Sequence, residues 1–128
     1  MTEEQKDLLL KDLCARLPYG VKVAFLNEDL THHSEPKTLI GIECVNNLNY
    51  SRLEDEDGNT TIVEFVKPYL FPMSSMTEEE RSEYEDMCDS FRGEEFCELV
   101  DWLNEHHFDY RGLIEKGLAL EAKEGMYD

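Results

Sequence analysis

Basic residues are scarce in this sequence: 12 Lys and Arg stand against 30 Asp and Glu, which gives a formal net charge of −18. A field of this sign repels phosphate backbones and anionic lipid headgroups. We therefore expect neither direct nucleic-acid binding nor binding to a membrane surface. A protein partner with a basic surface is favoured instead, and a charge that only keeps the protein soluble is the simpler alternative.

Long apolar runs are also lacking, so no segment is predicted to span a bilayer. The first residues are polar and do not form a signal peptide, so we expect a cytoplasmic protein. No C-x-x-C pair occurs among the four cysteines. In a reducing compartment they would remain free thiols, and we predict that they are small buried residues of the core. These cysteines are Cys14, Cys44, Cys88 and Cys97.

The usual catalytic and metal-binding motifs are missing. There is no glycine-rich phosphate loop and no strand–turn–helix nucleophile elbow. The stretch from Asp55 to Gly58 resembles a calcium loop, but glycine and the bidentate glutamate do not fall at the required positions, so a hairpin turn is predicted. The pairs His32–His33 and His106–His107 diverge on a helix or strand, and a cationic His107 would suit a helix C-terminus. We therefore predict no cofactor and no metal.

Apolar spacing changes from helical to alternating and back, which predicts one α+β domain over residues 1–128. Thr2 and Gln5 form a capping box for a helix that ends at Arg16. A small antiparallel sheet of four or five strands follows, for which SH3-like, barrel-like curvature is one possible form. Pro68 and Pro72 are expected to end it. The predicted strands are Val21–Phe25, Leu39–Val45 with a bulge at Gly41, Tyr50–Leu53 and Thr61–Val66, with Leu118–Leu120 as an optional edge strand.

The last third of the sequence predicts a C-terminal helical pair. Thr77 and Glu80 form a second capping box, and a third helix is expected from Glu94 to His107. Between Glu78 and Asp109 there are thirteen acids and two arginines, so this segment carries eleven of the eighteen excess negative charges. With the aromatic and aliphatic residues turned inward, the acids are expected to coat the outside. The candidate binding residues are Glu79, Glu83, Asp86, Glu94, Glu98, Asp101 and Glu105.

Three blocks of the chain carry a family resemblance: KDLCARLPYGV from Lys11, KPYL from Lys67 with PMSSMTEEE from Pro72, and FDYRGLI from Phe108 with GLALEA from Gly117 and GMY from Gly125. These blocks resemble a family of short proteins of gut Bacteroides-type genomes and their prophages, although Lys123 stands where the family favours proline. The family has no assigned activity, so the resemblance implies no catalytic residues and points to a mobile-element or accessory gene product. Tyr19, Tyr69, Tyr110 and Arg111 lie in these blocks, where a structural role is the simpler interpretation.

Two functions remain open. The favoured one is a non-enzymatic protein-interaction module that uses its acidic helical face or the open sheet edge; in a sharper form it imitates nucleic acid and occupies a DNA-binding protein. The alternative is a small enzyme in which Cys, His and carboxylates meet in a cleft. A deep pocket with converging His and acids favours the enzyme, whereas a convex acidic face favours binding. An edge strand could pair with a second copy, so no oligomeric state is predicted.

Overall fold

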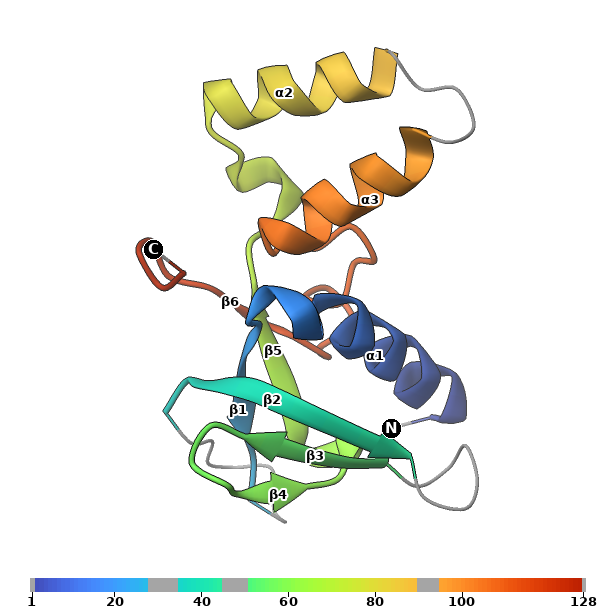
Figure 1. The fold of residues 1–128 in the computed structure, drawn as a ribbon, viewed down its shortest axis with the longest axis vertical. Helices are drawn as coiled ribbons and strands as arrows, with labels where there is room; N and C mark the ends of the chain where they lie inside the picture. Colours follow the sequence, from blue (N-terminus) through green and yellow to red (C-terminus); the bar gives the residue numbers. More distant parts are fainter. Residues whose placement is uncertain (1, 28–34, 45–50, 90–94, 128) are drawn as a thin grey trace.

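The computed structural model describes residues 2–27, 35–44, 51–89 and 95–127, without the side chains of 44, 89 and 95–97. It has an α+β fold with a mixed six-stranded sheet in the order β4-β3-β2-β1-β5-β6 (Figure 1). The predicted antiparallel sheet therefore has more strands and one parallel pair, β5 with β6. The elements are α1 (Glu3–Arg16), β1 (Lys22–Phe25), β2 (Lys37–Cys44), β3 (Ser51–Asp55), β4 (Thr60–Thr61), β5 (Val66–Leu70), α2 (Glu78–Asp89), α3 (Glu95–Glu105) and β6 (Leu120–Glu121), with short 3-10 helices η1 (Leu17–Tyr19), η2 (Val63–Phe65) and η3 (Met73–Ser75).

Helix α1 begins and ends as the sequence predicts. Thr2 and Gln5 exchange the two hydrogen bonds of a capping box, at 3.1 and 2.9 Å. The buried face of α1 is not purely apolar. Leu9 and Leu13 are buried, but so are Asp12 and Arg16, while Cys14 is exposed. The helical period explains this difference. Asp12 and Arg16 follow Leu9 and Leu13 by three residues and so lie on the same face, whereas Cys14 lies about 100° further round the helix from Leu13.

The prediction of buried cysteines is wrong for Cys14 and Cys88, both of which are exposed. The side chains of Cys44 and Cys97 lie outside the described residues. Within the described part of the chain, no helix combines the length and the apolar character that crossing a bilayer requires.

Strand β5 contradicts the prediction that Pro68 ends the sheet. Pro68 pairs with Val23 in the antiparallel β1–β5 ladder, and the strand continues to Leu70. Leu26 N–H donates to Phe65 O at 2.7 Å, so Leu26 and Phe65 form a hydrogen-bonded pair. Hydrogen-bonded and non-hydrogen-bonded pairs alternate along an antiparallel ladder, so Val23–Pro68 is a pair whose backbone groups point away from each other. Proline therefore removes no hydrogen bond to β1, and β6 pairs with β5 only from Tyr69 onward.

The predicted strand Thr61–Val66 is also wrong. β4 ends at Thr61, and Val63–Phe65 forms the 3-10 helix η2 before β5 begins at Val66. β-branched residues favour strands, but the burial of their side chains can override this preference. Val63 is buried in the core beneath α1, and the short helical turn places it there. The Gly41 bulge is confirmed, because the β2–β3 register shifts between Leu39 and Gly41.

The buried apolar side chains of the described residues form three clusters rather than one core. The largest lies between α1 and the sheet and contains Leu9, Leu13 and Val23. A second, around Ala24, Tyr69 and Ala122, covers the other face of β1 and β5. The third lies inside the helical pair of α2 and α3, which stands at the far end of the molecule from β4 (Figure 1). Phe71 packs against the second and third clusters and so connects them.

Candidate functional site

The outer side of α2 is acidic because its inner side is apolar. Tyr84 and Met87 pack into the cluster inside the helical pair. Glu79, Glu83 and Asp86 lie at i, i+4 and i+7 and are all exposed. The predicted solvent face of this helix is therefore confirmed. Thr77 caps the helix with Glu80, since Glu80 N–H donates to Thr77 Oγ1 at 3.1 Å and Thr77 N–H donates to Glu80 Oε1 at 2.9 Å.

Helix α3 repeats this arrangement. Leu99 and Leu103 are buried, while Glu98, Asp101 and Glu105 are exposed. Glu94, which was predicted to belong to the same surface, lies outside the described residues. Within Glu78–Asp89 and Glu95–Glu105 the single basic residue is Arg81. We call the six exposed residues the acidic face: Glu79, Glu83, Asp86, Glu98, Asp101 and Glu105.

Helix α3 ends in a Schellman motif with histidine where glycine is usual. Phe108 N–H donates to Leu103 O at 3.0 Å, and His107 N–H donates to Asn104 O at 3.1 Å. His107 has a φ of 59°, a left-handed conformation that histidine adopts more readily than most residues. This turn directs the chain away from α3 and buries the His107 side chain, which is 4% exposed.

His107 lines a cavity of about 420 Å³ between the end of α3, the turn after η1 and the C-terminal residues. The wall combines aromatic, acidic and imidazole groups that are distant in the sequence. We call it the His107 cavity, and its lining residues are Tyr19, Gly20, Lys22, Phe71, Glu80, Glu105, His106, His107, Met126 and Tyr127.

His107 is a neutral imidazole at neutral pH. Burial is the main cause that lowers its pKa to about 4, positive Arg16 and neighbouring His106 add to the effect, and the Tyr19 backbone opposes it. This finding contradicts the expectation of a cationic His107 that interacts with the helix dipole. Nδ1 of His107 is buried and has no hydrogen-bond partner among the described residues. An unpaired buried acceptor is costly, so this atom is suited to a donor from outside the chain.

A hydrogen bond to the backbone fixes the tautomer of His106. Its Nδ1 lies 2.8 Å from Trp102 O, and because a carbonyl can only accept, Nδ1 carries the proton. In neutral His106 the lone pair is therefore on Nε2. The ring packs on Trp102, with centroids 4.3 Å apart, which fixes its orientation beside the cavity.

Tyr127 closes the cavity on the side of the sheet. The next hydrogen-bonded position of the β1–β5 ladder would join Lys22 to Tyr69, but the Tyr127 hydroxyl occupies it. The hydroxyl accepts from Lys22 N–H at 2.9 Å and donates to Tyr69 O at 2.6 Å. Burial raises the pKa of Tyr127 far above its usual value, which keeps this donor protonated. The ring stacks on His107, with centroids 3.7 Å apart, and meets Phe71 edge-on at 5.9 Å.

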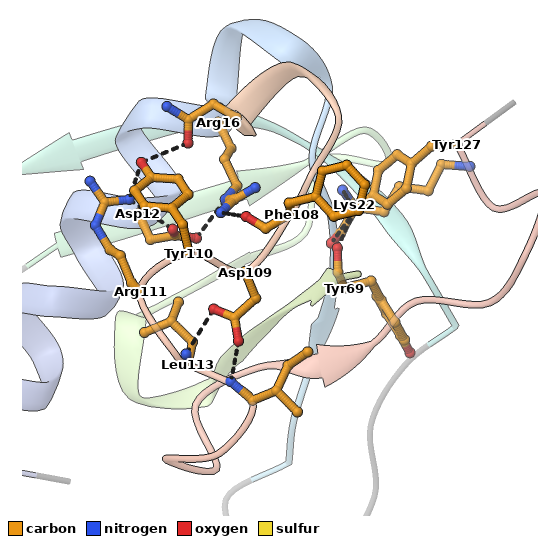
Figure 2. Close-up of polar contacts among 12 residues, drawn as sticks. Asp12, Arg16, Lys22, Tyr69, Phe108, Asp109, Tyr110, Arg111, Leu113 and Tyr127 are labelled. Carbon is orange, nitrogen blue, oxygen red and sulfur yellow. Dashed lines mark hydrogen bonds and ion pairs between the residues drawn. The ribbon is translucent and has the colours of Figure 1, made fainter. Parts of the chain in front are cut away.

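A buried ionic network holds the segment after α3 against α1 (Figure 2). Asp12 accepts from Arg16 Nε and from Arg111 Nη1, both at 2.9 Å, and both Asp12 and Arg16 are fully buried. Arg16 also donates to Phe108 O, next to His107. The Tyr110 ring lies beside both guanidinium groups, at 5.4 Å from Arg16 and 4.6 Å from Arg111. The network thus fixes the turn that carries the two histidines.

Of the four residues nominated from the family-like blocks, Tyr69, Tyr110 and Arg111 make structural contacts, and Tyr19 lines the His107 cavity. Arg111 binds the carboxylate of Asp12, as its simpler interpretation predicts. The Tyr69 backbone accepts from Tyr127, and Tyr19 lines the His107 cavity. This cavity could not be predicted from the sequence, because its walls come from segments near residues 20, 71, 80, 107 and 127. The only local signal was the His106–His107 pair, which had been considered for metal binding. Among the described residues, no group of three or more His, Cys, Asp or Glu could hold a metal ion.

A comparison with protein-family models, curated proteins and solved structures finds no match to this chain. The resemblance to a prophage-associated family therefore stays a prediction.

Proposed function

We propose that this chain is a non-enzymatic interaction module whose acidic face binds a protein partner with a basic surface. The observation that carries the proposal is the placement of the acids: all six described members of the acidic face are exposed on α2 and α3. The same helices bury their apolar residues against each other. The surface available to a partner is therefore strongly negative.

Charge repulsion supports this proposal. Glu79 and Glu83 are four residues apart on α2, as are Asp101 and Glu105 on α3, and like charges at this spacing weaken a helix by a few tenths of a kcal/mol. Arg81 alone opposes them on these helices. A basic partner would remove the repulsion, and the negative field would accelerate its encounter with the chain.

The test compares two variants with equal charge but different placement. One carries Glu79→Gln, Glu83→Gln and Glu98→Gln on the acidic face; the other carries Glu4→Gln, Asp7→Asn and Glu115→Gln, which are exposed elsewhere. The probe is a nine-residue oligo-arginine peptide, and the Kd is measured by calorimetry in about 0.1 M salt, where charges beyond about 10 Å are screened. We expect the first variant to bind about tenfold more weakly, and the control to bind as the parent does. Equal losses in both variants would refute a specific face.

A second candidate function is a small enzyme, and the His107 cavity is the observation that favours it, because histidines and carboxylates converge there. Its described lining residues include no serine, threonine or cysteine, so His106 would have to act as a general base on a bound substrate. Hydrolysis of activated esters that is faster than with free imidazole, and that is lost in His106→Asn, would support this function over the binding module.

A further inference from the structure

We propose that the His107 cavity binds a guanidinium group, namely an arginine side chain of the basic partner. This inference rests on the proposed function and names the chemical group that the module would recognise. The cavity adjoins the acidic face, because Glu105 belongs to both. A partner that lies along α3 would therefore have the cavity within reach of its side chains.

The first argument is charge. The cavity lining contains two carboxylates, Glu80 and Glu105, and one ammonium group, Lys22. Among the described residues, neither histidine forms an ion pair with a carboxylate. The neutral His107 adds no positive charge, and the two carboxylates outnumber the Lys22 ammonium. An anionic ligand such as phosphate would face two carboxylates, whereas a guanidinium would form charge-assisted hydrogen bonds with them. The capping bond from Thr77 holds Glu80 in place, and a carboxylate with one such bond can accept further donors.

The second argument is the unpaired acceptor. His107 is 4% exposed, lines the cavity, and has no partner at Nδ1 among the described residues. A ligand that donates hydrogen bonds would remove this cost. A guanidinium carries five N–H donors and no acceptor, so it can donate to the Glu80 and Glu105 carboxylates as well as to an imidazole nitrogen.

The third argument is shape. Phe71, His107 and Tyr127 make one side of the cavity aromatic. The Tyr127 and His107 rings stack on each other and His107 is 4% exposed, so the half-buried rings of Tyr127 and Phe71 are the ones on which a ligand would stack. Guanidinium groups stack on aromatic faces, where the attraction between the cation and the ring adds to the ion pair. An ammonium is a compact, strongly hydrated point charge and lacks this planar match. The wall therefore favours arginine over lysine.

The test uses agmatine as the guanidinium probe, on the full chain, and compares it with N-carbamoylputrescine, in which a neutral urea replaces the guanidinium while the ammonium group is kept. Binding is followed by NMR through the imidazole carbon-bound protons of His106 and His107. We expect saturable shifts with agmatine and at least about tenfold weaker binding of the urea analogue, since the charge-assisted bonds are lost. Equal binding of both compounds, or displacement of agmatine by inorganic phosphate, would overturn the inference.

Matched variants locate the site. Glu80→Gln removes the charge but retains a residue that can complete the capping box, and Glu85→Gln removes the same charge from an exposed position on the same helix. Glu105→Gln is matched by Glu115→Gln. Agmatine should bind about tenfold more weakly to Glu80→Gln and Glu105→Gln than to either control. Equal effects of the cavity and control variants would contradict the assignment.

The two proposals can fail separately. If oligo-arginine and oligo-lysine peptides of equal length bind equally, and agmatine gives no shifts at the histidines, the cavity inference fails while the acidic face stands. If agmatine binds but the acidic-face variant binds oligo-arginine as well as the parent does, the proposed function fails. If free arginine binds as tightly as an arginine within a peptide, the cavity is a site for a small molecule, and the assignment to a partner's side chain is overturned.

Discussion

At the scale of single residues, His107 combines three unusual properties. It adopts a left-handed backbone conformation, it is buried, and it stays neutral because burial lowers its pKa to about 4. Glycine would fit the backbone without strain, but it would offer neither a ring to stack on Tyr127 nor an acceptor nitrogen. The side chain therefore contributes to the cavity what the usual residue at a helix end does not.

This neutrality predicts a pH dependence of stability. In the unfolded chain the pKa of His107 is about 6.5, so between pH 6.5 and pH 4 the unfolded state binds more protons than the folded state. The stabilisation is fully present above pH 6.5 and is lost as the pH falls toward 4. The free energy of unfolding should fall by about 1 to 2 kcal/mol more in the parent than in His107→Asn between pH 7 and pH 5.

Urea unfolding at the two pH values checks this prediction. Asparagine is the suitable replacement because it also tolerates the left-handed conformation at a helix end. Arg16 and His106 are the charged and titratable groups that act on His107 in the fold, and both stay in the variant. Identical pH dependence in parent and variant would show that His107 does not titrate as the structure implies.

Asp12 gives a second prediction for a single residue. It is fully buried and binds two guanidinium groups. Asp12→Ala should lower the free energy of unfolding by about 3 kcal/mol, because it leaves Arg16 as a buried charge without its carboxylate. Adding Arg16→Met removes that charge, so the double variant should be more stable than Asp12→Ala alone. Urea unfolding of the three proteins decides the question; a double variant that is less stable than the single one would contradict it.

At the scale of elements, the β1–β5 ladder depends on a residue at the end of the chain. The Tyr127 hydroxyl joins Lys22 N–H to Tyr69 O across the two strands. Tyr127→Phe should therefore cost about 1 to 2 kcal/mol, since it leaves two partly buried backbone groups without their partner.

Amide hydrogen exchange and urea unfolding measure this effect. The Lys22 amide should exchange faster in Tyr127→Phe, while the Ala24 amide, which pairs directly with Lys67, should keep its protection. Tyr19→Phe is the control, because it removes a hydroxyl from the same cavity without touching these strand bonds. Unchanged exchange at Lys22 would show that water replaces the phenol at no cost.

The elements that the sequence predicts well are those specified by neighbouring residues. Both capping boxes and the inward-facing aromatic and aliphatic side chains of the helical pair are local patterns, and the structure confirms them at Tyr84 and Met87. Pro68 in β5 could not be predicted, because its place depends on which strand pairs on each side.

The candidate site could be predicted only in part. The exposure of the acidic face follows from helical periodicity, and it is confirmed for the six described members. The burial of Asp12 and Arg16 and the assembly of the His107 cavity depend on contacts between distant segments, such as the bond from Arg16 to Phe108 O across 92 residues. Such side chains are indistinguishable in the sequence from charged residues on a solvated surface.

At the scale of the whole molecule, the main apolar core and the acidic face belong to different parts of the fold. The sheet and α1 enclose the largest apolar cluster, while the helical pair has its own cluster and carries the acidic face (Figure 1). Phe71 and the His107 cavity lie where the two parts meet. A basic partner could therefore bind α2 and α3 and place one side chain at the junction without disturbing the main core.

The most direct test of this account is the salt dependence of oligo-arginine binding to the parent and to the variant with Glu79→Gln, Glu83→Gln and Glu98→Gln. If the acidic face forms the contact, the affinity of the parent falls steeply between about 0.05 and 0.5 M salt, and the variant shows a shallower slope as well as a weaker Kd. Parallel slopes for the two proteins would mean that the peptide responds to the overall charge of the chain, and the acidic face would not be a binding site.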